Sequence, residues 1–343
     1  MESNLQKLSE EMLHALDREL RAVLRAGEGV RDTFYLMMHY QMGWVDEGFA
    51  PVQEKGGKKI RPLLCLLTCG AAGGSWKAAI PAAAAVEIFH NFSLIHDDIE
   101  DLSEIRRGRP THWKRWGTGP AINTGDAMFG SAFLALAGLP GSGEPGILSE
   151  VLPRFSRASV ELTRGQHLDM EFENRMDVAV EEYLGMISGK TAAVMSLCCE
   201  AGALVAGAGG ETVSGFASFG RDLGMAFQIH DDILGIWGDE ANTGKSAESD
   251  VITRKKTLPV IYGLSRSGVM RELYSKPGAA GDFLPRVMAE LDFIGAHGFA
   301  ADVEKKYSEA AQKSLEALRT SCARNEFFSA LGELMNTLLS RKR

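Results

Sequence analysis

Residues 89–113 read FHNFSLIHDDIEDLSEIRRGRPTHW, an apolar run followed by an acidic and then a basic cluster. The stretch overlaps residues 81–101, which begin with Pro81 and continue through four alanines, as the first turns of a helix do. Helical periodicity recurs at residues 5–25, 151–174, 180–207, 215–238, 255–266, 284–296 and 301–320. Alternating strand patterns are nearly absent. The sequence therefore predicts an all-α protein, with residues 1–343 forming one large helical domain.

The acidic cluster at the end of helix 81–101 predicts a metal site. Asp97 and Asp101 are one turn apart on one face, with Asp98 beside them. Like charges at this spacing repel, and the apolar run before them disfavours a freely solvated face. Oxygen ligands that leave room for water and phosphate suit Mg²⁺. An exposed acidic helix end is the alternative for this cluster taken alone.

A second acidic cluster repeats the first. The tetrapeptide Ile-His-Asp-Asp occurs at residues 95–98 and again at residues 229–232, near the end of another apolar helical stretch. Asp231 and Asp232 belong to this second copy, and Asp239 follows further on. Two such helix ends that face each other across a cavity could hold one diphosphate through bridging metal ions.

Basic segments supply the complementary charges. Residues 56–62 read GGKKIRP, a glycine-flanked basic turn that leads into an apolar helix and suits an anion. The spacing is not that of a P-loop. Arg106, Arg107 and Arg109 follow the first acidic cluster closely, and Lys190 and Lys255 lie in further basic segments. Together these segments predict a pocket for two diphosphates.

Composition sets broader limits. The chain has 37 Lys and Arg against 45 Asp and Glu, a net charge of −8 that argues weakly against a nucleic-acid binder. Five irregularly spaced cysteines indicate free thiols in a reducing compartment. No signal peptide and no membrane span are recognised, so a cytoplasmic location is expected.

The motifs in their order resemble those of the trans-isoprenyl diphosphate synthase (polyprenyl synthase) family. The matching segments are GGKKIRP, residues 89–113, GDAMF, GQHLDME, GKTA, FQIHDDILGIWGD, TGKSAESD and KKTLP, which run from Gly56 to Pro259. Residues 1–50 match no motif and show only helical character. The resemblance implies an all-α homodimer with a central cavity, which joins isopentenyl diphosphate head-to-tail to an allylic diphosphate.

The resemblance also implies a role for each matching residue. Two or three Mg²⁺ ions would be held by Asp97, Asp101 and Asp231, with help from Asp98 and Asp232. The allylic diphosphate would be bound by Arg106, Lys190 and Lys245, and isopentenyl diphosphate by Lys58, Arg61, His90 and Arg107. The allylic carbocation would be stabilised by Thr191 and Gln228. Gln166 and Asp169 would organise their neighbours, and Lys255 would close the site.

The second acidic motif departs from the family pattern, which has a third aspartate where this chain has Gly235. Glycine has no side chain to bind a metal. We therefore expect Asp231 to contribute most of the metal binding in this motif, with Asp239 at most binding through water.

Three residues before the first motif predict the product length. Ser93 and Phe89 lie four and eight residues before Asp97 on one helix face. The small Ser93 leaves the upper part of a product tunnel open, and Phe89, about 12 Å deeper, forms its floor. An aromatic residue at the position of Phe92 resembles the geranylgeranyl type of synthase. We expect a product of twenty carbons, with the fifteen-carbon farnesyl diphosphate as the alternative.

Two other functions are weighed against this one. A class I terpene cyclase shares the first motif and Mg²⁺, but it would need an Asn/Asp–Ser/Thr–Glu triad where this chain has IHDDILG, and it would have no isopentenyl site. A non-catalytic synthase subunit would have lost the first acidic cluster or Arg106 and Arg107, and both are present.

Overall fold

The computed structural model describes residues 3–27, 29, 31–52, 57–140, 146–238, 249–275, 280–322 and 324–340. The all-α prediction is confirmed: within these residues the only named strands are two of two residues each. The chain divides into two compact units. Unit 1 comprises Met1–Arg154, Cys198–Val213 and Thr320–Leu331, and unit 2 comprises Phe155–Leu197, Ser214–Arg319 and Gly332–Arg343. The single domain expected from the sequence stays a prediction.

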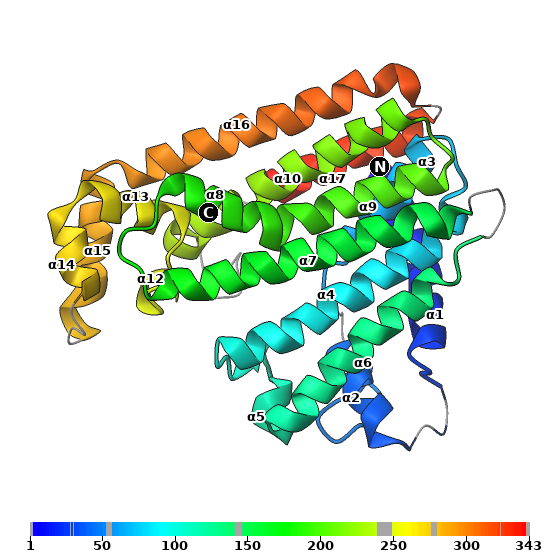
Figure 1. Cartoon of the computed structure of the whole chain (residues 1–343), viewed down its shortest axis with the longest axis horizontal. Coiled ribbons are helices and arrows are strands. Elements are labelled where there is room, and N and C mark those ends of the chain that lie inside the picture. The colour runs from blue at the N-terminus through cyan, green and yellow to red at the C-terminus, as the bar shows by residue number, and fades with distance from the viewer. Residues whose placement is uncertain are drawn as a thin grey trace. The chain divides into compact units, whose positions relative to one another are not determined.

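Unit 1 is built around helix α4 (Ile80–Glu100), which carries the first acidic motif at its end. Its other elements are α1 (Asn4–Val23), α2 (Thr33–Gln41), α3 (Ile60–Ala71), η1 (Trp76–Ala79), β1 (Ile105–Arg106), β2 (Arg109–Pro110), α5 (His112–Trp116) and α6 (Thr118–Leu136). Helix α4 contacts α1, α3, α5 and α6, and α6 lies along it (Figure 1). Pro81 lies in the first turn of α4, as expected.

The amphipathic stripe predicted for residues 5–25 is confirmed in α1. Met12, Leu16, Leu20 and Leu24 are all 0% exposed. Ser3 caps the start of the helix by accepting a hydrogen bond from the amide of Gln6 at 3.2 Å.

The basic segment after α4 forms a β-hairpin that the sequence did not predict. Strands β1 and β2 pair antiparallel, with Ile105 opposite Pro110 and Arg106 opposite Arg109. The two loop residues, Arg107 and Gly108, have φ angles of 55° and 75°, as a type I′ turn requires. A left-handed conformation costs a residue such as arginine about 1 kcal/mol, so surrounding contacts must stabilise this turn.

Unit 2 and the segments that join the units are also helical. Their elements are α7 (Ile147–Glu173), α8 (Val180–Ile187), the π-helical turn η2 (Ser188–Ala192), α9 (Ala193–Val205), α10 (Gly210–Trp237), α12 (Ser249–Ile252), α13 (Leu258–Arg266), α14 (Gly268–Ser275), α15 (Ala280–Phe293), α16 (Ala296–Ala317), η3 (Arg319–Ser321) and α17 (Asn325–Leu339). The helix expected at residues 180–207 is thus interrupted by one wider turn at η2. Such turns are often found at functional sites.

Unit 2 has two apolar clusters. One joins α8, α10, α13 and α16 through residues such as Tyr183, Ile229 and Ile261. The other joins α10, α12, α13, α14 and α15. Because α10 belongs to both clusters, the second acidic motif at its end is held on a rigid support.

One helical segment, Trp76–Glu100, is long and apolar enough to cross a membrane, and 67% of its most apolar window is buried inside the protein. That burial is typical of a core helix, since α4 is packed among the other helices of unit 1. Two residues named in the sequence predictions, Asp239 and Lys245, lie outside the described residues.

Candidate functional site

The two Ile-His-Asp-Asp segments are built alike, each in its own unit. In both, the isoleucine is fully buried, the first aspartate is half-buried, and the second aspartate is 2% exposed. The first aspartates are Asp97 and Asp231, and the second are Asp98 and Asp232. The predicted facing arrangement of the two segments stays a prediction.

Asp98 and Arg106 form an ion pair at the end of α4. The Arg106 Nε donates to Asp98 Oδ1 at 2.7 Å, which ties strand β1 to the helix. Burial raises the pKa of Asp98, and the Arg106 guanidinium acts in the opposite direction. Asp101 is exposed at the C-terminal cap of α4, where its amide donates to the Asp97 carbonyl at 2.8 Å. The exposed and half-buried carboxylates, Asp101 and Asp97, are therefore those that a metal ion in solution can reach.

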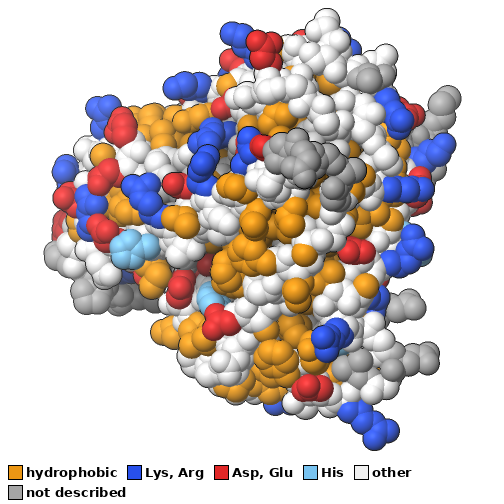
Figure 2. Space-filling view, turned by 45° about the vertical axis from the view of Figure 1, so that its right-hand side comes forward, with side chains coloured by type: hydrophobic (Ala, Val, Ile, Leu, Met, Phe, Trp, Pro, Cys, Tyr) orange, Lys and Arg blue, Asp and Glu red, His pale blue; other side chains and the backbone are white. Residues whose placement is uncertain are grey.

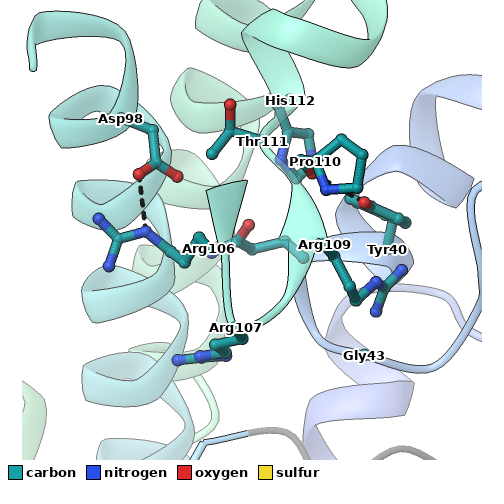
Figure 3. Close-up of a pocket in the computed structure, with 10 residues that line it drawn as sticks. Tyr40, Gly43, Asp98, Arg106, Arg107, Arg109, Pro110, Thr111 and His112 are labelled. Carbon is teal, nitrogen blue, oxygen red and sulfur yellow. Dashed lines mark hydrogen bonds and ion pairs between the residues drawn. The ribbon is translucent and has the colours of Figure 1, made fainter. Parts of the chain in front are cut away.

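A small pocket lies beside this ion pair (Figure 3). Its lining residues come from α2, the following turn, α4, the hairpin and α5: Tyr40, Gln41, Gly43, Asp98, Arg106, Arg107, Arg109, Pro110, Thr111 and His112. Three arginines and one carboxylate give this pocket a net positive charge, which suits an anionic group.

The start of α3 brings a second group of cations to unit 1. Lys58 is exposed, and Lys59 Nζ lies 3.7 Å from Asp17 Oδ1. The Arg61 guanidinium donates to His90 Nε2 at 3.3 Å, since a guanidinium has no acceptor atom. Burial and the charges of Arg61 and Arg107 hold the pKa of His90 well below its usual value. His90 is therefore neutral and carries its proton on Nδ1.

A buried carboxyl group accompanies these cations. Glu87 is 4% exposed, and its Oε1 accepts a hydrogen bond from Asn91 Nδ2 at 3.1 Å. Burial raises the pKa of Glu87, while Lys59, Arg107 and Arg61 lower it. Only its place as an acidic residue inside an apolar helix marks Glu87 in the sequence.

In unit 2, the predicted diphosphate-binding lysine meets the predicted organising aspartate. Lys190 Nζ lies 2.5 Å from Asp169 Oδ2. This contact depends on a close approach of α7 and η2 at Gly165. A Cβ on Gly165 would lie 2.3 Å from the backbone nitrogen of Lys190, so the position requires glycine. Gln166, the other predicted organiser, is buried on α7.

Thr191 and Gln228 are joined in a hydrogen-bonded chain that ends at Asp232. Thr191 Oγ1 donates to Gln228 Oε1 at 2.8 Å, and Gln228 Nε2 donates to Asp232 Oδ1 at 3.1 Å. Asp232 Oδ2 accepts from the Tyr183 hydroxyl and from the Leu258 amide. Burial raises the pKa of Asp232 to about 7. Both oxygens of Asp232 thus bind protein groups, and the amide of Gln228 is held in one orientation.

Gly235, where the family pattern has an aspartate, is covered by another carboxylate. A Cβ on Gly235 would lie 2.1 Å from Asp250 Oδ2. Asp250 is the last residue of the TGKSAESD segment and lies in α12. Its carboxylate lies against the Cα of Gly235, where the missing side chain would begin.

The adjacent residues Lys255 and Lys256 differ completely in their surroundings. Lys255 is exposed, and its charge acts to lower the pKa of Asp232. Lys256 is 7% exposed and donates to the carbonyls of Phe172, Glu173 and Arg175 at the end of α7. Lys256 is therefore a structural residue that fixes the position of its neighbour.

The residues predicted to set the product length lie in an aromatic cluster between α4 and α6. Phe89 is 0% exposed, and its ring centroid lies 5.3 Å from that of Phe92. Phe129, from the GDAMF segment, lies 5.0 Å from Phe92 and 6.1 Å from Phe89. Ser93 is buried and donates to the His90 carbonyl at 2.9 Å. The tunnel and its floor stay predictions.

The donor set of the acidic motifs fits Mg²⁺, since it consists of carboxylate oxygens that leave positions for water and phosphate. Within the described part of the chain, no three His, Cys, Asp or Glu side chains form a ready-made metal cage. A metal ion held by one or two carboxylates and the substrate's phosphates agrees with that arrangement.

Known proteins resemble this chain throughout its motif region. The family described as polyprenyl synthetase matches residues 43–290. A (2E,6E)-farnesyl diphosphate synthase of Mycobacterium tuberculosis is 46% identical over 232 residues, which are 68% of this chain and 64% of that protein. The match thus spans slightly less than two thirds of that relative's length. A geranylgeranyl diphosphate synthase of the same species is 41% identical over 259 residues, 74% of this chain and 73% of that protein.

A solved structure has the same fold. The polyprenyl synthase of Caulobacter crescentus, complexed with calcium and isoprenyl diphosphate, matches with a TM-score of 0.83 at 25% identity, over 99% of this chain and 98% of that one. The family match covers well over half of the chain, and it agrees with the helical fold and the motif order. The chain belongs to the polyprenyl synthetase family.

Proposed function

We propose that this protein is a trans-prenyl diphosphate synthase, which condenses isopentenyl diphosphate with an allylic diphosphate. The observation that carries the proposal is the shared design of the two aspartate segments. Each presents one aspartate to solvent and uses the next to hold a group that the reaction needs, Arg106 in unit 1 and Gln228 in unit 2. Family membership supports the same activity.

The allylic substrate is ionised by charge stabilisation of its leaving group. Asp97, Asp101 and Asp231 would hold Mg²⁺, which would supply positive charge to the departing diphosphate. Arg106, Lys190 and Lys245 bind the same diphosphate through charge-assisted hydrogen bonds. The calcium in the related Caulobacter structure supports a divalent cation. Mg²⁺, and its presence as two or three ions, belongs to this proposal.

Thr191 and Gln228 stabilise the allylic carbocation. Because Gln228 Nε2 is bonded to Asp232, its Oε1 is held as the negative end of the amide dipole. The oxygen of Thr191, 2.8 Å away, adds a second dipole. Fixed dipoles need no reorganisation as the charge develops, so they stabilise the transition state more than the ground state.

Isopentenyl diphosphate is bound by Lys58, Arg61, His90 and Arg107. His90 is neutral and accepts from Arg61 on Nε2, so its Nδ1 proton is available to a phosphate oxygen across the physiological pH range. The double bond of isopentenyl diphosphate attacks the carbocation, and the condensed product then loses a proton to the departing diphosphate. Lys255, exposed beside Asp232, closes the site and excludes water, which would otherwise capture the carbocation.

Asp250 completes the second acidic motif. Its carboxylate covers Gly235 and can therefore substitute for the aspartate that this chain lacks at that position. We assign it the outer-sphere role that was expected of Asp239.

The product is geranylgeranyl diphosphate, with farnesyl diphosphate as the alternative. Relatives of both kinds match, and the aromatic cluster of Phe89, Phe92 and Phe129 supports a short product. Replacing Phe89 or Phe92 with alanine should lengthen the product, and unchanged products from both variants would remove the floor assignment.

The protein acts as a homodimer in the cytoplasm. Figure 2 shows a face on which hydrophobic side chains gather. On α6, Ile122 is 41% exposed and Leu134 is 68% exposed, which suits contact with a second copy. Sedimentation equilibrium of the full chain tests whether the protein is a dimer. A monomer at micromolar concentration would contradict this part of the proposal.

The decisive experiment is incubation with labelled isopentenyl diphosphate, Mg²⁺ and each allylic starter in turn, followed by chain-length analysis. We expect elongation to twenty carbons, and no elongation with any starter would refute the function. Asp97→Ala and Asp231→Ala should abolish turnover, whereas a cyclic hydrocarbon product would indicate a terpene cyclase.

A further inference from the structure

The hairpin that carries Arg107 needs external support. A two-stranded hairpin of two-residue strands has little stability of its own, and its turn places an arginine at a positive φ where asparagine or glycine is favoured. The position of the Arg107 side chain therefore depends on what holds each strand.

The first strand is held by α4 and by the base of the hairpin. Arg106 is paired with Asp98 at 2.7 Å. At the base, the Thr111 hydroxyl donates to the Ser103 carbonyl at 2.7 Å, and the Thr111 amide donates to the Glu104 carbonyl at 2.9 Å.

The second strand is held by the segment that precedes the family motifs. The Arg109 guanidinium carbon lies 3.8 Å from the centroid of the Tyr40 ring, and Arg109 Nη2 donates to the Val45 carbonyl at 2.7 Å. The Tyr40 hydroxyl donates to the Pro110 carbonyl at 2.8 Å. Tyr40 and Arg109 line the same pocket as Arg106 and Arg107 (Figure 3).

Tyr40 is itself rigid. It is 5% exposed, and its ring meets the edges of His112 and Trp116 at centroid distances of 5.4 and 4.9 Å. His112 in turn donates from Nε2 to the Met37 carbonyl at 3.0 Å. A cation stacked on a fixed, buried ring is a strong and directional contact.

The result is that the Arg107 side chain reaches the glycine-flanked basic turn. Its Nη2 lies so close to Gly57 that a Cβ there would be 2.8 Å away. Arg107 thereby lies near Arg61 and His90, and the charge of Arg107 helps to lower the pKa of His90.

We propose that Tyr40 and Arg109 are positioning residues for the isopentenyl diphosphate site. They fix strand β2 and so hold Arg107 against Gly57. The inference rests on the proposed function, in which Arg107 binds isopentenyl diphosphate. It also assigns a role to residues 37–45, most of which precede the region matched by the family.

Steady-state kinetics of full-length variants test the inference. Arg109→Ala should raise the KM for isopentenyl diphosphate about tenfold, as expected when a cation–π contact and a charged hydrogen bond are lost together. The KM for the allylic diphosphate should change less than about twofold, because Arg106 keeps its partner on α4. Arg109→Lys, which keeps a cation over the ring, should restore most of the affinity.

Tyr40→Phe keeps the ring and removes only the hydrogen bond to Pro110, so we expect a rise of about threefold in the same KM. Arg115→Ala is the matched control, since Arg115 is exposed on α5 and lies 3.8 Å from Glu47. Its KM values should equal those of the wild type.

Arg107→Ala separates the inference from the proposed function. If Arg107→Ala leaves the KM for isopentenyl diphosphate unchanged, the proposed role of Arg107 is wrong. If Arg107→Ala raises it while Arg109→Ala and Tyr40→Phe do not, the positioning role is refuted. Equal increases in both KM values, with a lowered melting temperature, would also refute it and would indicate general loss of structure.

Discussion

Replacing Lys256 with methionine should destabilise the protein with no direct effect on its chemistry. The buried ammonium donates to the carbonyls of Phe172 at 2.8 Å and Glu173 at 3.0 Å and also to that of Arg175. The last carbonyls of a helix have no partner within the helix, and Lys256 donates to two of them, those of Phe172 and Glu173, and to the Arg175 carbonyl just beyond the end of α7.

The magnitude follows from these three contacts. A hydrogen bond to a charged group contributes roughly 1.5–3 kcal/mol. The desolvation of the ammonium, which lowers the pKa of Lys256, offsets part of the sum. Methionine fills a similar volume but leaves the buried Phe172 carbonyl and the part-buried carbonyls of Glu173 and Arg175 without the ammonium. We therefore expect the free energy of unfolding to fall by about 2–4 kcal/mol.

Urea denaturation followed by circular dichroism measures this change, and Lys255→Met is the matched control. The exposed Lys255 should contribute less than about 0.5 kcal/mol to stability, whereas its removal should lower prenyl transfer. We therefore expect Lys256→Met to lower stability and Lys255→Met to lower activity. A Lys256→Met protein with the unfolding midpoint of the wild type would refute the reasoning.

Three further predictions rest on other buried or crowded groups. Burial lowers the pKa of His112 from 6.5 to about 4, so the folded state binds its proton less readily than the unfolded state. The contribution of neutral His112 to the free energy of unfolding should be fully present above pH 6.5 and should fall by about 3 kcal/mol as the pH drops to 4. In urea titrations at a series of pH values, His112→Gln should reduce this dependence of stability on pH. An unchanged dependence would contradict the prediction. Asp250→Asn should weaken Mg²⁺ binding about tenfold, measured by calorimetry in the presence of inorganic diphosphate. Gly235→Ala should weaken it similarly, because the added methyl group displaces the Asp250 carboxylate. Asp282→Asn, at an exposed residue, is the control, and equal affinities in all proteins would remove Asp250 from the site. An aromatic disulfide reagent should modify Cys322 first in the folded protein. Burial raises the pKa of the other four thiols and keeps them protonated and unreactive: Cys65, Cys69, Cys198 and Cys199. Early labelling of any of these four would contradict the prediction.

Local sequence pattern predicted the helices well, because a helix is stabilised by contacts three and four residues apart. The stripe on α1 and the first turn of α4 at Pro81 are examples. The hairpin at Arg106–Arg109 was missed, since its strands are two residues long and its turn places an arginine where the usual signal is Asn-Gly.

The candidate site was predicted in part. The motifs predicted roles for Lys190, Asp169, Thr191 and Gln228. In the structure Lys190 is hydrogen-bonded to Asp169, and Thr191 is hydrogen-bonded to Gln228. Tyr183 and Tyr40 carried no signal in the sequence, and Arg109 and Asp250 lay in recognised segments without a role of their own. Each acts through a partner that no local spacing connects to it.

The sequence by itself thus determined the helical class, the order of the motifs and the residue types available to the chemistry. Only the tertiary structure decided how neighbours with the same side chain divide their tasks. Asp98 and Asp232 face inward while Asp97 and Asp231 meet solvent, and Lys256 is buried beside the exposed Lys255. The physical reason is distance along the chain: Lys256 binds a carbonyl 84 residues away, and such a partner exists only after folding.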